Sequence, residues 1–134
     1  NAKKIRVKIP SHPNYPKMGF RQMISGKIFY MQKSDKIKKR KVYRFMHLFN
    51  FKDNKVISYD YDSKLKAKMI HWLPISKKLI KTKILMPDGK TLSGFSEPDV
   101  SKLRVGETVQ FERFGFCRFD KTDKKVYSFW FTHK

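Results

Sequence analysis

Apolar residues in this chain alternate with polar ones over short runs, and this period of two constrains the fold more than any other feature. Successive side chains of a β-strand point to opposite faces, whereas an amphipathic helix repeats its apolar residues every three or four positions. Basic and aliphatic residues alternate in Lys4–Ile9, and aromatic residues recur along one face of Val42–Phe51, whose other face is also partly apolar. The pattern predicts an all-β chain with Val42–Phe51 as a central strand.

Turn signals separate the alternating runs. Asp53-Asn54-Lys55 predicts a turn, as does Pro87-Asp88-Gly89, in which Pro presets φ and Gly accepts a positive φ. One short helical turn is expected after Ser96, which would cap it, with Pro98 early in the turn. Many short strands with frequent turns are typical of an antiparallel barrel or sandwich. The other expected strands are 27–33, 56–61, 68–73, 80–86, 91–95, 109–111, 116–119 and 126–131.

The chain carries a large excess of positive charge. It has 32 Lys and Arg against 11 Asp and Glu, so its net charge is +21. Such a field repels itself unless a polyanion lies nearby, which makes nucleic acid the leading partner and an anionic membrane surface the second. Residues 1–52 contribute +14 of this charge, so the N-terminal part attracts anions most strongly.

No catalytic or metal-binding pattern stands out in the 134 residues. The four His are scattered without ligand spacing, and Cys117 is alone, so no internal disulfide can form. The sequence has no phosphate-binding glycine loop, no dinucleotide fingerprint, no apolar stretch of 18 residues and no visible signal peptide. We therefore expect a binding module without a metal site or a membrane partner, located in a reducing cytoplasm.

Two stretches mix cations with aromatic residues, a combination that suits single-stranded RNA. The first is Gly19–Gln22, in which Arg21 and Gln22 offer the directional hydrogen bonds that fit base edges. It begins at the end of residues 10–20, where three Pro and one Gly interrupt regular strand pairing.

The second stretch is Val109–Phe116. Alternation would place Phe111 and Arg113 on one face and Gln110 and Glu112 on the other. These side chains suit base recognition, but an internal pair of Glu112 with an arginine in a barrel strand is an equally weighted alternative.

Residues 36–41 form a basic segment between two expected strands. Lysines act as point charges for phosphates rather than as readers of bases. A solvated, mobile loop is the alternative of equal weight. The phosphate-binding candidates are Lys36, Lys38, Lys39, Arg40 and Lys41.

Six stretches, in order along almost the whole chain, resemble the anticodon-binding β-barrels of class I glutaminyl-tRNA synthetases and archaeal or eukaryotic-type glutamyl-tRNA synthetases. The strongest is GETVQFERFGF at residues 106–116. The short hairpin at residues 84–89 favours the glutamyl branch. The other five are HPNYPKMGFRQ at 12–22, VYRFMHLFN at 42–50, IHWLP at 70–74, GFSEP at 94–98 and FWFTH at 129–133.

The resemblance implies two linked antiparallel β-barrels that grip the anticodon loop of a tRNA. We expect sub-barrels over residues 20–66 and 67–134, with 1–19 shared with or packing on the second and a crossover near 63–68. Met46 departs from the basic residue that some glutaminyl enzymes have there. By the resemblance, Arg21, Gln110 and Arg113 contact anticodon bases, and Gln22 and Arg44 match the family in residue type.

The resemblance also implies partners that lie outside this chain. We expect it to bind tRNA-Glu, with tRNA-Gln as an open alternative, and to work with a catalytic domain or separate catalytic chain that uses ATP and Mg. Nothing in the sequence resembles the ATP motifs of that part, so no cofactor and no tRNA charging are expected of this chain alone, whether it is an excised piece or a split-gene subunit. The alternatives are a glutaminyl-type domain and a generic basic β-barrel that binds RNA or the ribosome.

Overall fold

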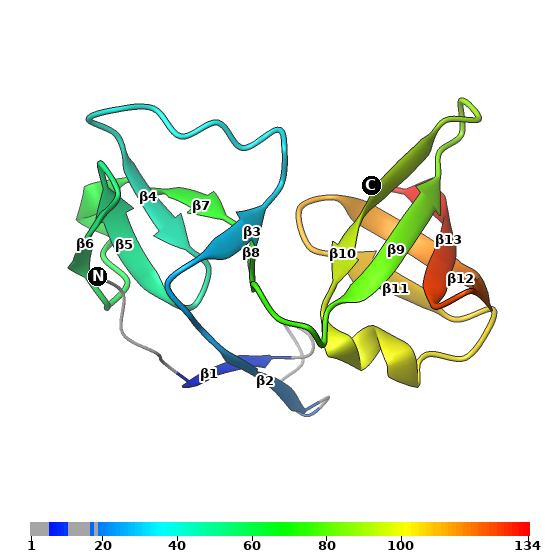
Figure 1. Cartoon of the computed structure of the whole chain (residues 1–134). Coiled ribbons are helices and arrows are strands. Elements are labelled where there is room, and N and C mark those ends of the chain that lie inside the picture. The colour runs from blue at the N-terminus through cyan, green and yellow to red at the C-terminus, as the bar shows by residue number, and fades with distance from the viewer. Residues whose placement is uncertain (1–5, 11–16, 18) are drawn as a thin grey trace. The chain divides into compact units, whose positions relative to one another are not determined.

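The computed structural model describes residues 6–10, 17 and 19–134, and every structural statement below concerns these residues. The chain divides into two compact units, Asn1–Ile75 and Ser76–Lys134, each of which is described by itself. Strands dominate both units, and the longest helical segment described is a five-residue 3₁₀ turn, Pro98–Lys102 (Figure 1). The all-β class predicted from the alternation is confirmed.

Short strands in three small sheets build the first unit. They are β1 (Arg6–Pro10), β2 (Phe20–Ile24), β3 (Phe29–Met31), β4 (Val42–Phe45), β5 (Phe49–Lys52), β6 (Lys55–Ser58), β7 (Lys68–Ile70) and β8 (Trp72–Pro74). β1 pairs with β2, β3 pairs with β8, and the others form a sheet in the order β6-β5-β4-β7. The pairings are antiparallel except for the parallel pair β4–β7.

The segment Val42–Phe51, predicted as one strand, is instead the hairpin of β4 and β5. The Leu48 N–H donates to the Phe45 carbonyl at 2.9 Å, and His47 has a φ of 60°, which a continuous strand does not contain. The alternation missed this turn because it holds neither Gly nor Pro. Both strands are nevertheless central, since each has a neighbour on either side.

Residues 67–75 hydrogen-bond within the first unit, although the expected sub-barrel boundary grouped them with residues 76–134. β7 pairs with β4 and β8 pairs with β3, so the run expected as one strand over 68–73 forms two strands with different partners. The division accordingly falls after Ile75. Within the segment 1–19, β1 pairs with β2 in this same unit, whereas residues 1–5, 11–16 and 18 lie outside the described residues.

Aromatic rings fill the first unit. The centroid of the Phe45 ring lies 4.6 Å from that of Phe51 and 4.9 Å from that of Phe29. Trp72, which is 1% exposed, packs edge-on against Phe29 at 5.4 Å, and its Nε1–H donates to the Met46 carbonyl at 2.8 Å. Such pairs each contribute about 0.5–1.5 kcal/mol beyond the area they bury. The aromatic faces predicted by the alternation thus form this core.

One five-stranded sheet builds the second unit. Its strands are β9 (Ile80–Leu85), β10 (Thr91–Ser96), β11 (Thr108–Phe111), β12 (Gly115–Asp123) and β13 (Val126–His133). Their order is β10-β9-β13-β12-β11, with a parallel pair β9–β13 at the centre and antiparallel pairs elsewhere (Figure 1). The edge strands β10 and β11 do not pair with each other, so the hydrogen-bonded sheet is open rather than a closed barrel.

The inner face of this sheet carries the core of the second unit. Cys117, Phe119 and Phe129 are buried, and Val100 of the 3₁₀ turn packs with them. Their sequence neighbours Arg118 on β12 and Trp130 on β13 point outward, and Trp130 is 50% exposed. Alternation therefore separates a dry face from a solvated face in this unit.

Tight turns join the hairpins where the sequence predicted them. Asp53 and Asn54 have φ values of 48° and 61°, and two consecutive positive φ values are typical of the type I′ turn that suits hairpin twist. The turn at Pro87–Gly89 is also confirmed, with the Gly89 N–H donating to the Met86 carbonyl at 2.9 Å. The loop expected over 120–125 is shorter, because β12 and β13 stay paired as far as Asp123 and Val126.

The predicted helical turn is present, but Ser96 does not cap it. The Ser96 hydroxyl accepts a hydrogen bond from the Thr82 hydroxyl at 2.7 Å inside the sheet. Glu97 holds the N-cap position, its side chain does not cap the backbone of the turn, and Pro98 begins the turn as expected. The prediction failed because Ser96 is the last residue of β10 and faces the core.

Gly115 marks a close approach between β12 and β13, and replacing it tests the packing there. Its φ of 149° is strained for other residues, and an added Cβ would lie 2.6 Å from the Phe131 ring and 2.8 Å from the His133 carbonyl oxygen. We expect Gly115→Ala to lower the free energy of unfolding by about 2 kcal/mol, as overpacking and strain usually do. Gly94→Ala is the control, since no atom lies within 4 Å of its Cβ. Equal urea midpoints for the two variants would contradict this packing.

Candidate nucleic-acid interface

β2 carries two candidate base readers on opposite faces. Arg21 lies opposite Ile9 in the β1–β2 ladder, is partly buried, and shares its face with the buried Met23. Gln22 lies opposite Lys8 and is exposed. Gln22 therefore faces outward, whereas Arg21 lies on the packed side of this ribbon. The contact of Arg21 with an anticodon base stays a prediction.

The outward face of the β1–β2 ribbon places a cation over an aromatic ring. The Lys8 Nζ lies 4.4 Å from the centroid of the Phe20 ring, which is 50% exposed. Arg6 and Gln22 extend this face by alternation, and both are exposed. Cations that pair with phosphates beside rings that stack with bases suit single-stranded nucleic acid.

Arg44 holds a buried position in the first unit. It is 7% exposed, and its Nη1 donates to Asn50 Oδ1 at 3.1 Å and to the carbonyls of Tyr59 and Asp60 at 3.1 and 3.3 Å. The Asn50 amide in turn donates to the Ser58 hydroxyl and to the Asp60 carbonyl, each at 2.7 Å. This network ties β4 and β5 to the chain after β6. The structure gives Arg44 a scaffolding role, and the tRNA contact expected of it stays a prediction.

Removing the Arg44 guanidinium tests this network. We expect Arg44→Ala to lower the free energy of unfolding by about 2–3 kcal/mol, because it leaves buried oxygen acceptors without their donor. Arg104→Ala is the control, since Arg104 is exposed. Urea unfolding of both variants measures the difference. A decrease in stability for Arg44→Ala no larger than for the control would show that the network is not structural.

Gln110 and Arg113 are neighbours in sequence but lie in different local structures. Gln110 is exposed on β11. Arg113 lies beyond the end of the strand, in a turn where it has a φ of 61° and where the Phe114 N–H donates to the Phe111 carbonyl at 3.0 Å. The alternation predicted for this stretch thus stops at Phe111, and Arg113 is exposed in the β11–β12 turn. Arg21, by contrast, belongs to the first unit.

The basic segment 36–41 is anchored to the sheet by a buried tyrosine. The Tyr43 hydroxyl accepts the Lys38 N–H at 2.9 Å and donates to the Lys36 carbonyl at 3.5 Å. The Arg40 N–H donates to Asp53 Oδ1 at 2.7 Å. These bonds hold the backbone and argue against a freely mobile loop. The exposed cations of the segment are Lys36, Lys38, Lys39, Arg40 and Lys41.

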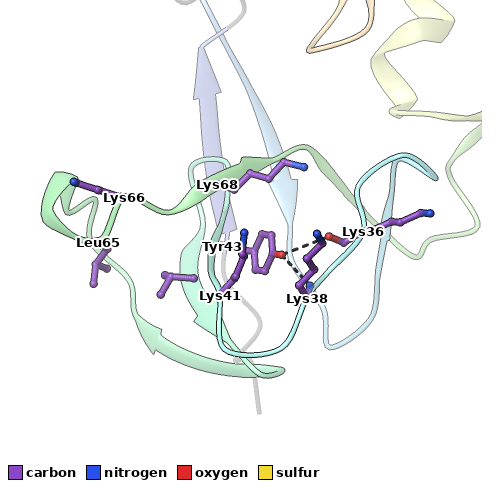
Figure 2. Close-up of a pocket in the computed structure, with 8 residues that line it drawn as sticks. Lys36, Lys38, Lys41, Tyr43, Leu65, Lys66 and Lys68 are labelled. Carbon is purple, nitrogen blue, oxygen red and sulfur yellow. Dashed lines mark hydrogen bonds between the residues drawn. The ribbon is translucent and has the colours of Figure 1, made fainter.

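A pocket of about 390 Å³ lies beside this segment, and no acidic residue lines it. Three of its lysines come from the segment, while Lys66 and Lys68 follow the 3₁₀ turn Ser63–Leu65. Figure 2 shows the Tyr43 ring in the midst of these lysines, with the hydrogen bonds from its hydroxyl to the segment. The lining residues are Lys36, Lys38, Lys41, Val42, Tyr43, Leu65, Lys66 and Lys68.

The buried acid nearest in sequence to the pocket lysines is already paired. Asp35, which is 4% exposed, lies 3.1 Å from the Lys68 ammonium, so its charge is partly offset within the fold. The sequence pattern did not single out Lys66 and Lys68, because residues 63–68 were expected to form a crossover. The pairing of β7 with β4 brings them beside the basic segment. The sequence signal that could have pointed to them is the basic run with Lys at positions 64, 66 and 68.

Metal ligands, membrane-spanning helices and the lone thiol of Cys117 are the remaining candidate features of the described residues. No three His, Cys, Asp or Glu gather there as a metal site would require. None of its helices is long and apolar enough to cross a membrane. Burial raises the pKa of the Cys117 thiol to about 11, so this thiol is protonated near neutral pH and is a weak nucleophile.

The open β-sheets, the unmatched cations and the lysine-lined pocket define a β-rich module suited to nucleic acid. Residues 27–120 match the family model of the class I tRNA synthetase (E and Q) anti-codon binding domain, and the chain belongs to this family. The resemblance seen in the sequence is thereby confirmed.

Proteins named glutamate–tRNA ligase are among its relatives. The one from Methanocaldococcus jannaschii is 39% identical over 99% of this chain and 26% of its own length. Those from Pyrococcus furiosus and Methanococcus maripaludis strain C7 are 33% and 32% identical, each over 99% of this chain, and 26% and 25% of their own lengths. This chain therefore spans about a quarter of the length of these relatives.

The pocket lysines provide a test of phosphate binding. Removing one phosphate-binding cation should reduce the slope of log affinity against log salt by about 0.7 for single-stranded RNA. We expect Lys38→Ala and Lys66→Ala each to show this change and to weaken all RNAs alike, because lysines carry no base preference. Lys102→Ala is the control, since Lys102 pairs with Asp99 at 2.8 Å. Unchanged slopes for both pocket variants would remove the pocket from the interface.

Proposed function

We propose that this chain reads the anticodon of tRNA-Glu as the anticodon-binding part of a glutamate–tRNA ligase. The observation that carries the proposal is the match over nearly the whole chain to several archaeal proteins of that name. The family model supports anticodon binding. The net charge of +21 supports a polyanionic partner.

In this proposal the anticodon loop is unstacked and its bases are read singly. Arg21, Gln110 and Arg113 supply directional hydrogen bonds to base edges, with Gln22 available on the outward face of β2. The exposed position of Gln110 and the place of Arg113 in a turn leave both side chains accessible to a loop. Lysines of the segment 36–41 and of the pocket hold backbone phosphates, which position the loop without reading it.

The chemistry of charging lies elsewhere in this proposal. A catalytic domain or separate catalytic chain in the cytoplasm binds ATP and Mg and joins glutamate to the acceptor end of the tRNA. This chain contributes by docking the anticodon, which orients the acceptor end toward that distant site. The short hairpin of β9 and β10 supports a glutamyl over a glutaminyl partner, and tRNA-Gln is the natural competitor because its anticodon shares the central U.

Binding of tRNA-Glu transcripts with altered anticodons tests the proposal. We expect the unaltered chain to bind more weakly when an anticodon base is changed, by about tenfold for a base read through a bidentate contact. Arg113→Ala and Gln110→Ala should each reduce this discrimination, whereas Lys102→Ala should leave it intact. Filter binding at one fixed salt concentration gives the ratios.

Indifference of the unaltered chain to the anticodon would contradict the proposal. If the chain bound unrelated RNA as tightly as tRNA-Glu, a generic RNA-binding module would replace it. If tRNA-Gln bound better than tRNA-Glu, the partner would be a glutaminyl enzyme.

A further inference from the structure

The outer face of the second unit's sheet carries a row of exposed side chains across its central strands. Trp130 on β13 lies opposite Arg118 on β12 and beside Leu85 on β9. In the neighbouring row, Ser128 lies between Lys83 and Lys121. We call these six residues the outer sheet face, and all except the partly buried Ser128 are exposed.

Trp130 is the most unusual member of this face. It lies on the central strand and is 50% exposed, whereas the other tryptophan of the chain, Trp72, is 1% exposed. Among the described residues, Trp130 makes no ring contact, and its indole N–H has no hydrogen-bond acceptor. A large aromatic ring exposed to water on the face of a sheet presents a surface on which another planar group can stack.

The positive charges near Trp130 favour a planar group that is joined to negative charge. Lys83, Arg118 and Lys121 form no ion pair with any residue that the structure describes, and all three are exposed. Asp120, a bulge residue next to Lys121, is the acid closest to them in sequence. The face is therefore net positive, and Lys83 lies diagonal to Trp130 across the parallel β9–β13 pair.

We propose that the outer sheet face binds an unstacked base of single-stranded RNA. The base stacks on the Trp130 indole, and Arg118 and Lys83 contact the phosphates on either side of it. The inference deepens the proposed function, on which it rests for the identity of the RNA. It also links the face to a base reader, because Gln110 lies opposite Phe116 on the same side of the sheet, and Phe116 stacks on His133 at 4.6 Å.

An RNA loop fits this face better than the other possible occupants. A protein partner would be expected to meet an apolar centre, but here three cations that form no ion pair with any described residue share two rows of the sheet with Trp130 and Leu85. An RNA duplex offers phosphates, but its bases are stacked internally and would leave the indole without a partner. A looped strand supplies both the phosphates and an unpaired base.

Tryptophan fluorescence of the whole chain tests the proposal. Single-stranded RNA of seven nucleotides with the anticodon-loop sequence of tRNA-Glu should quench the emission saturably, because a stacked base quenches indole. Trp130→Phe should abolish the quenching while keeping the affinity within about threefold, since a ring remains. Trp130→Ala should weaken binding by about tenfold, measured by anisotropy of labelled RNA.

The buried Trp72 gives an internal reference, since it should stay unquenched in Trp130→Phe. Arg118→Ala and Lys83→Ala should each lower the affinity and the salt slope while leaving quenching at saturation intact. The proposal is overturned if the RNA binds without quenching Trp130, or if Trp130→Ala binds as tightly as the unaltered chain. Quenching caused by the catalytic part alone, and not by RNA, would assign the face to a protein partner and also overturn it.

Failure of this inference is distinguishable from failure of the proposed function. If affinity depends on the anticodon but the fluorescence of Trp130 is not quenched, only the stacking site is contradicted. If an unrelated heptanucleotide quenches Trp130 equally well and the affinity for tRNA does not depend on the anticodon, the stacking site is supported and the proposed function is contradicted.

Discussion

The placement of Phe129 and Trp130 on opposite faces of β13 is the constraint on which the second unit depends. This strand pairs on both sides, in parallel with β9 and antiparallel with β12, so neither of its faces can shift without moving the sheet. Phe129 is 1% exposed on the inner side, and its neighbour Trp130 is 50% exposed on the outer side. A slip of one residue would exchange them. The same pairing that builds the core therefore presents the aromatic ring to solvent.

In the first unit, buried polar groups fix the positions of the segments that follow β6 and precede β4. Arg44 and Asn50 bind backbone carbonyls after β6, and the Tyr43 hydroxyl binds the backbone of the segment 36–41. These hydrogen bonds lie within the fold, but the segments that they hold determine where the exposed lysines lie. In a chain of net charge +21, such anchoring matters because unpaired cations repel each other and would spread apart. The lysine-lined pocket results from this anchoring together with the parallel pair β4–β7.

Local patterns predicted strand content and turns, but not pairing between distant strands. Alternation identified residues 80–86 and 126–131 as strands, where the structure has β9 and β13, because burial follows a period of two wherever one side of a sheet is packed. It missed the turn at His47 and the turn at Arg113, since each is a non-glycine residue with positive φ. It could not separate a buried Arg44 from an exposed one. Lys66 and Lys68 escaped notice because their neighbours come from a different part of the chain.

In the proposed function, this module holds an RNA loop by its phosphates and presents aromatic and amide groups to the bases. Hydroxyl-radical footprinting of a tRNA-Glu transcript bound to this chain tests that central claim most directly, because it shows which nucleotides are covered. The account predicts protection concentrated in the anticodon loop and stem, with the acceptor end unprotected. Protection spread evenly over the tRNA, or confined to the acceptor end, would contradict it.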